Sequence, residues 1–579
     1  ITDTFDSIPY EITLEKICIY IKTQDLIKES YTNCQTTYAC GNTESSKVLQ
    51  VKCVKQGYPL SMTIFNLCIK YLLQVPNEPL EKAVFAQWIN HCLQNDKLTS
   101  HHLPISPGND ELYEKLSDGL VLIQLVNYHF PNSIHPRAIF YDIPITRRNK
   151  LKNIALAFIT AICYGCNLDS INIYQVFSGV KTVILEMIWQ IIKVGFTYEV
   201  NVINYPDLML LRKQTESLYD FREVSASQLV LRYINYQLSR SGGSGSVESY
   251  FDNFSDGNVY HNLVLKLFPN SSPLHARRGS SKDDKIIVKI QMAMNILEEN
   301  KANFFLKSEM FVNSLKNSMS VWKFHFLQFH WFFRNFRLEY HETVSKDIGN
   351  VEENKEKFLR NFLNSFGLEP FCNDLSANNR NSLLLMRLLM TIDRLGFRDR
   401  GFISVFDENY SVSERIHNAA LILNRMDEYK IKEDNLYPEY IAKSHKETIK
   451  NLLIKLLGWW LMKGNINVKE LKNWVNKLMS TRSKPIKISS FRDIKIYRQY
   501  IFAIILDILE PKNINFDFLK CMDVKEFTQY YVSIARRCGY LIFTIPEQFM
   551  ACEYDFIVLA FATLMYNKKH NNISCPGYE

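Results

Sequence analysis

A short pattern recurs four times along the chain and limits the possible folds more than any other feature. An aromatic residue, an aliphatic residue and an asparagine stand together at Trp88-Ile89-Asn90, Tyr233-Ile234-Asn235, Phe362-Leu363-Asn364 and Trp474-Val475-Asn476. By subtraction, the triplets begin 145, 129 and 112 residues apart, about the size of one small domain. This repeat predicts that the 579 residues form several similar domains rather than one core.

Three further apolar segments follow each triplet in the same order. The first begins at Asp118, Asp256, Asn381 or Tyr500, and its apolar residues recur at three- and four-residue steps, as in a buried helix. The triplet segment and these three predict four main helices per unit. A generic helical array is the alternative, and the long unit with its non-equivalent helices disfavours it.

The composition narrows the class of protein. A hydrophobic fraction of 47% with 22% charged residues is typical of a globular chain. A net charge of +8 is too small for the dense basic surface that nucleic-acid binding requires, so we expect no nucleic-acid partner. Thirteen irregularly spaced cysteines and no secretory signal indicate reduced thiols inside the cell. No apolar run approaches the length of a membrane span.

No pattern indicates catalysis. The Cys163–Cys166 pair has no second pair at zinc-binding spacing, so both thiols are expected in the core. His101-His102 stands in a proline-rich loop, and His325 and His330 fall on different faces of one helix. No phosphate-binding, dinucleotide-binding or hydrolase motif is present. We therefore expect a non-enzymatic chain with no catalytic residue, no metal ligand and no cofactor.

The repeated residues resemble the calponin-homology fold, and their arrangement is similar to that of the fimbrins (plastins). The resemblance rests on Trp88 and Asn90, on Asp118-Gly119-Leu120, and on the segments Leu185–Phe196, Arg360–Pro370 and Ser533–Phe549. The last segment is the most specific, because Arg536, Arg537, Gly539, Pro546 and Glu547 stand in the family's order. The third unit departs from the pattern with Asn381-Ser382 in place of Asp-Gly.

The resemblance implies an all-α chain of four calponin-homology domains, arranged as two tandem pairs in a compact monomer. It implies that each pair binds one actin filament, so that the chain bundles filaments in the cytoplasm as part of the actin cytoskeleton. An actin side-binder that does not bundle, or a cytoskeletal scaffold or adaptor, is the alternative.

Domain boundaries follow from the repeats and from a charged, apolar-poor segment after the second unit. The predicted parts are a linker or degenerate headpiece (1–79), four domains (80–200, 201–337, 358–464 and 465–568), a connector (338–357) and a tail (569–579). Fimbrins commonly carry paired EF-hands before the first domain. Residues 1–79 contain no such loop, so calcium binding is not expected.

One helix carries more apolar surface than a small domain needs. In Val183–Phe196, Leu185, Trp189, Ile192 and Phe196 form one stripe, and Ile184, Ile188, Ile191 and Gly195 form another. The second stripe must meet a neighbouring domain or a partner.

The resemblance also implies which segments meet actin: Phe85–Leu93, Val183–Phe196, Gln228–Leu238, Phe358–Phe366 and Thr448–Leu461. Within them we expect Trp88 and Trp189 in the core. The candidates for exposed contacts with filamentous actin are Gln87, His91, Gln190, Lys193, Lys450 and Lys455.

Overall fold

The computed structural model divides into two units, residues 1–77 and 78–579. In the second unit it describes residues 78–142, 144–202, 204–239, 246–250, 257–269, 271, 282–305, 322–338, 354–368, 371–392, 410–431, 436–462, 467–482 and 485–569. In the first unit it describes four two-residue strands: β1 (Gln35–Thr36) pairs antiparallel with β4 (Val48–Leu49), and β2 (Ala39–Cys40) with β3 (Thr43–Glu44). The predicted headpiece, connector and tail lie wholly or largely outside these residues.

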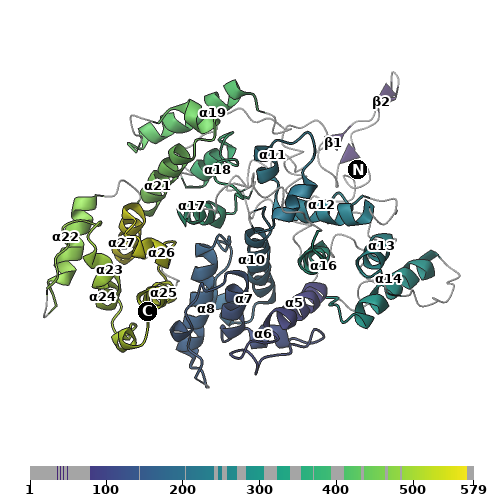
Figure 1. Ribbon diagram of the computed structural model, residues 1–579, viewed down its shortest axis with the longest axis horizontal. Coiled ribbons are helices and arrows are strands. Elements are labelled where there is room, and N and C mark those ends of the chain that lie inside the picture. Colours follow the sequence, from purple (N-terminus) through teal and green to yellow (C-terminus); the bar gives the residue numbers. More distant parts are fainter. Residues whose placement is uncertain are drawn as a thin grey trace. The chain divides into compact units, whose positions relative to one another are not determined.

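The second unit is built from helices, which confirms the all-α class (Figure 1). Each repeat contains four main helices in the predicted order. The opening helices are α5 (Glu78–Leu93), α12 (Ala226–Ser239), α17 (Asn354–Ser365) and α22 (Val468–Met479). The second helices are α7 (Leu120–His129), α13 (Asn258–Leu267), α18 (Leu383–Ile392) and α24 (Ile501–Leu509). The third helices are α8 (Arg147–Cys163), α14 (Lys282–Glu299), α19 (Val412–Glu428) and α25 (Val524–Arg537). The closing helices are α10 (Lys181–Glu199), α16 (Trp322–Asn335), α21 (Lys446–Met462) and α27 (Tyr554–Lys569).

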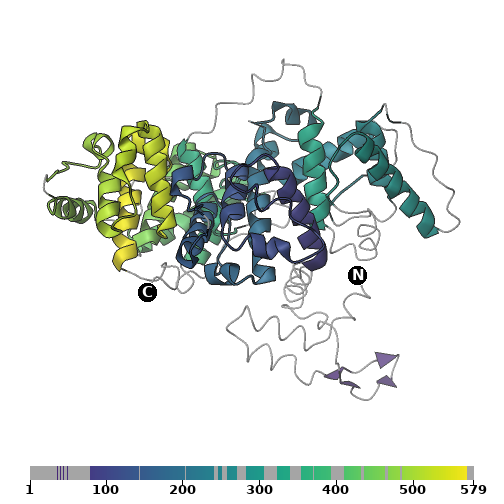
Figure 2. The same cartoon turned by 90° about the horizontal axis from the view of Figure 1, so that it is seen from below.

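Short helices connect the main ones. They are α6 (Glu111–Lys115), η1 (Pro136–Ala138), α9 (Ile173–Phe177), η2 (Pro206–Leu211), α11 (Leu218–Glu223), α20 (Pro438–Ala442), α23 (Lys495–Arg498), η5 (Phe516–Lys520) and α26 (Pro546–Met550). Both views show the yellow helices of the fourth repeat gathered into one bundle (Figures 1 and 2). Helix α17 begins at Asn354, inside the segment predicted as the connector.

In each repeat, the second main helix begins directly after a residue with a left-handed backbone conformation. Gly119 has φ +81° before α7, and a Cβ there would lie 2.7 Å from the backbone nitrogen of Ile154, so this position requires glycine. In the third repeat, Ser382 takes the same conformation at φ 64°. The preceding side chain caps both helices, because Asp118 accepts from the Leu120 N–H and Asn381 from the Leu383 N–H. The departure from Asp-Gly therefore preserves the turn.

The asparagine of each triplet binds the backbone of the loop that follows. Asn90 accepts from the Ile105 N–H at 2.7 Å and donates to the Ile105 carbonyl at 2.8 Å. The same two bonds join Asn235 to Val247, Asn364 to Cys372, and Asn476 to Ile488. All four loop residues are buried. The asparagine thus seats one apolar loop residue in each core and satisfies both of its backbone groups.

No helix among the described residues is both long enough and apolar enough to cross a membrane.

Candidate functional site

Helix α10 is covered on two sides. Trp189 meets Trp322 of α16 at a ring-centroid distance of 4.9 Å, and Phe196 meets His330 of the same helix at 4.0 Å. On the other side, a Cβ at Gly195 would lie 2.4 Å from Nδ1 of His129 in α7. Both apolar stripes are therefore buried inside the described structure: the stripe with Trp189 and Phe196 meets the second domain, and the stripe with Gly195 packs within the first domain.

A single polar row remains on α10. Thr182, Glu186, Gln190, Lys193 and Thr197 follow one another at three- and four-residue steps, and each is at least partly exposed. Gln190 donates to Glu186 at 2.7 Å, whereas Lys193 is exposed. Of the candidates predicted on this helix, Lys193 is the one most available to a partner.

The candidates on α5 are less exposed. Gln87 is half-buried. His91 Nδ1 lies 2.8 Å from Nδ2 of Asn303 in the second domain, and its ring packs against Phe305. Burial and the nearby Arg334 guanidinium lower the pKa of His91. His91 therefore takes part in a contact between domains. The expected core position of Trp88 is confirmed, because it is 0% exposed.

Two largely buried ion pairs join the first and second domains. Lys323 of α16 lies 2.9 Å from the Glu81 carboxylate, and both side chains are 7% exposed. Burial raises the pKa of Glu81 despite the attraction of Lys323. Arg334 donates to Glu199 at 2.7 Å and to the Tyr128 hydroxyl at 2.7 Å. These contacts make the two domains one module, because separating them would leave charges without their partners.

In the second pair, α21 packs against α17 and against α27 of the fourth domain. The expectation that Lys450 is exposed is wrong: Lys450 is 2% exposed and pairs with Glu447 at 3.0 Å and with Glu356 at 3.5 Å. The polar row on this helix consists of Glu447, Asn451 and Lys455, of which the first two are exposed and Lys455 is half-buried.

The first domain also contacts the fourth, at a surface we call the first seam, where α8 and η1 pack on α25 (Figure 1). The His135 N–H donates to the Ser533 hydroxyl at 3.0 Å, and Arg537 donates to the Ala138 carbonyl at 2.7 Å. Arg536 donates to the Ser133 carbonyl at 3.4 Å. The two arginines that marked the last repeat in the sequence are thus buried where these domains meet.

A second seam joins the second domain to the third. Arg380 lies 2.8 Å from Asp220 and 2.9 Å from Glu223 of α11. Asn373 donates to the Val224 carbonyl at 3.2 Å. The sequence pattern did not predict either seam, because the residues that contact each other across a seam are more than 140 positions apart in the chain.

The thiols of Cys163 and Cys166 and the imidazoles of His325 and His330 are buried. Cys163 and Cys166 are 1% and 0% exposed, as expected for core residues, and burial raises the pKa of Cys163 to about 11. Burial lowers the pKa of His325 and of His330 to about 3. These groups stay neutral in the folded chain at physiological pH and act as packing residues.

Comparisons with known proteins agree with this architecture. A family model, the calponin homology (CH) domain, matches residues 79–196 and 224–333. Plastin-3 of Homo sapiens is 24% identical over 536 residues, which cover 84% of this chain and 79% of the relative. Plastin-2 of Danio rerio is 25% identical over 513 residues, which cover 84% and 80%. Plastin-1 of Gallus gallus is 23% identical over 508 residues, which cover 84% and 79%.

Among solved structures, the crystal structure of the actin-crosslinking core of Schizosaccharomyces pombe fimbrin superposes with a TM-score of 0.70 at 19% identity. The match covers 85% of this chain and 100% of that core. The fold of the whole core is therefore present, including the two repeats that the family model does not match. The chain is a homologue of the plastins over most of its length, shares the fold of the fimbrin core, and has two repeats that match the calponin homology (CH) domain.

Proposed function

We propose that this chain binds actin filaments through both of its modules and cross-links them into bundles. The similar fimbrin structure is that of an actin-crosslinking core, and the full length of that core is matched. The observation that carries the proposal is the presence of two modules, each with a polar helix row, joined through two seams. One row runs along α10 and the other along α21.

Bivalence supplies the mechanism. Once one module is bound, the second meets a neighbouring filament at high effective concentration, which raises the overall affinity without new contacts. A module of about 250 residues has a radius of gyration of about 18 Å. Modules joined directly at the seams hold filaments close together, which favours tight bundles over open networks.

The chain acts in this proposal as a non-catalytic monomer in the cytoplasm, without a bound cofactor and without calcium control from residues 1–79. Gln87, Gln190, Lys193 and Lys455 are the proposed contact residues. His91 is a weaker candidate for a contact with actin, because its Nδ1 already lies at hydrogen-bond distance from Asn303. Lys450 is not among them, because it is buried.

Paired low- and high-speed co-sedimentation with filamentous actin tests the proposal. We expect actin and the chain together in the low-speed pellet. Pelleting with actin only at high speed would favour a side-binder or adaptor that does not bundle. No co-pelleting at low salt and micromolar protein would reject the proposal.

A charge reversal tests the surface itself. Lys193→Glu replaces an attraction for the acidic filament with a repulsion, so we expect binding to weaken by about fivefold, equal to about 1 kcal/mol. Lys469→Glu is the matched control, because Lys469 is an exposed lysine on α22, outside the proposed surface. Equal affinity of the two variants would show that the α10 row does not face actin.

A further inference from the structure

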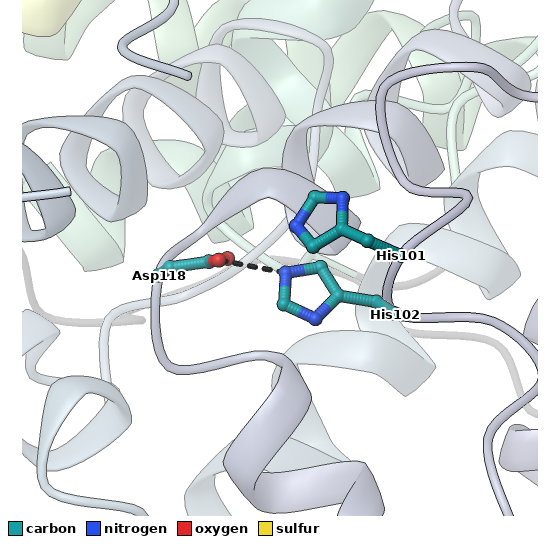
Figure 3. Close-up of side chains that lie close together, drawn as sticks. All are labelled: His101, His102 and Asp118. Carbon is teal, nitrogen blue, oxygen red and sulfur yellow. Dashed lines mark hydrogen bonds and ion pairs between the residues drawn. The ribbon is translucent and has the colours of Figure 1, made fainter. Parts of the chain in front are cut away.

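Three side chains that can bind a metal lie together in the first domain, and none of them belongs to either polar row. They are His101, His102 and Asp118, and one ligand atom from each lies within 4.8 Å of the other two (Figure 3). Asp118 Oδ2 is 2.7 Å from His102 Nε2, and the two imidazole ring centroids are 4.0 Å apart. Asp118 follows His102 by 16 residues, which is why the sequence did not reveal the cluster.

Two of the three groups are held in place by the fold. Asp118 caps α7 through Oδ1, so that Oδ2 points to the histidines, and its carbonyl accepts from Asn153. The His102 N–H donates to the Thr99 carbonyl at 2.8 Å. The Asn90 bonds to Ile105 hold the same loop from its other end. The carboxylate and one imidazole are therefore preorganised.

The third group is free to adjust its position. His101 is exposed, whereas the side chains of His102 and Asp118 are 16% and 10% exposed. A rotation of the His101 side chain changes no core packing. Two adjacent imidazoles are not needed to satisfy Asp118, because His102 and the Leu120 N–H already do so.

We propose that His101, His102 and Asp118 bind one zinc ion. Zinc takes imidazole nitrogen and carboxylate oxygen at about 2.0–2.2 Å, which places tetrahedral donor atoms about 3.3 Å apart. The pair now 2.7 Å apart has to open by about half an ångström, and the His101 nitrogen has to approach both. Calcium and magnesium are disfavoured because they prefer oxygen ligands. The ion ties the loop after α5 to the start of α7 and leaves a fourth position for water or an outside ligand.

Zinc titration of the reduced full-length chain against a chromophoric chelator tests this site. The chain also contains 13 cysteines that compete for zinc, so the decisive quantity is the difference between variants. His101→Gln removes an exposed imidazole and is expected to leave the fold intact. His417→Gln is the matched control, because His417 is an exposed histidine on α19.

We expect the wild type and His417→Gln each to bind one zinc ion at this site. His101→Gln should bind that ion about tenfold more weakly or not at all. Zinc should also raise the midpoint of thermal unfolding of the wild type more than that of His101→Gln. Asp118→Asn should also fail to bind this zinc ion, and circular dichroism checks that the variant is folded. Equal zinc binding by the wild type and His101→Gln, or no bound zinc in the wild type, would overturn the proposal.

Discussion

At the scale of single residues, one asparagine per domain explains the repeat that the sequence displays. Its amide group can both accept from a backbone N–H and donate to a backbone carbonyl of the same residue. In all four domains the partner is a buried apolar residue 8 to 15 positions later. The triplet is therefore a structural signature of the domain, and its recurrence along the chain carries no information about the actin surface.

Replacing this asparagine should destabilise its domain, and the loss should be larger where the asparagine is more deeply buried. Asn364→Ala leaves the buried N–H and carbonyl of Cys372 without partners, and we expect a loss of about 2–4 kcal/mol in the free energy of unfolding. Asn476→Ala should lose less, because Asn476 is only half-buried and water can replace its bonds. Urea unfolding of both variants measures the difference. An equal loss would show that burial does not set the strength of this contact.

Buried histidines should make the chain less stable in mild acid. Burial lowers the pKa of His325 and His330 to about 3, and burial with the charge of Arg334 holds the pKa of His129 well below 6.5. As pH falls below about 6.5, the unfolded chain takes up protons that the folded chain excludes, so stability falls by about 1.4 kcal/mol per pH unit for each group.

The urea midpoint measured between pH 7 and pH 5 checks this expectation. His330→Phe keeps a ring beside Phe196 and removes one titrating group, so its midpoint should fall less steeply with pH. The same slope in His330→Phe and the wild type would contradict the assignment.

At the scale of helices, α10 shows what periodicity can and cannot predict. The sequence correctly located two apolar stripes on this helix, because each repeats at helical spacing. It could not decide between a neighbouring domain and a partner, since both would bury the same side chains. The same limit applies to Lys450, which sits in a helix of good amphipathic pattern and is nevertheless buried beside Glu356. Side-chain burial between domains depends on docking, which a local pattern does not encode.

A methyl group at Gly195 should disturb the packing of α10 on α7. Its Cβ would lie 2.4–2.5 Å from three atoms of His129, whose ring packs against Trp88 and Phe196. We expect Gly195→Ala to cost about 1–3 kcal/mol through overpacking. Gly108→Ala is the control, because no atom lies within 4 Å of a Cβ there. Thermal unfolding compares the two variants, and equal midpoints would mean that α10 and α7 pack less closely than described.

At the scale of the whole molecule, the seams decide how the two modules are used. Sequence patterns predicted the four helices of each repeat, because helical periodicity depends on residues close in the chain, and the charged segment after the second repeat predicted the division into two pairs. The pairing of Arg537 with Ala138, or of Arg380 with Glu223, joins different domains and has no periodic signature. If the seams fix the modules relative to each other, they also fix the distance between two bound filaments.

Weakening the second seam should therefore change the spacing of filaments in a bundle more than the affinity of the chain for actin. Arg380→Glu removes two ion pairs and places like charges beside Asp220 and Glu223, at a cost of about 1 kcal/mol after allowance for solvent exposure. Arg380 lies outside both polar rows, so high-speed co-sedimentation should stay unchanged. Electron microscopy of the bundles should show a broader distribution of inter-filament spacings.

A compensating variant separates this effect from a general loss of stability. Glu223→Arg, combined with Arg380→Glu, restores opposite charges across the second seam and should restore the narrow spacing. Glu223→Arg alone should broaden the spacing, because Arg380 then faces a like charge. If Arg380→Glu leaves the spacing narrow, the second seam does not control bundle geometry, and variants at Ser533 and Arg537 of the first seam are the next to compare.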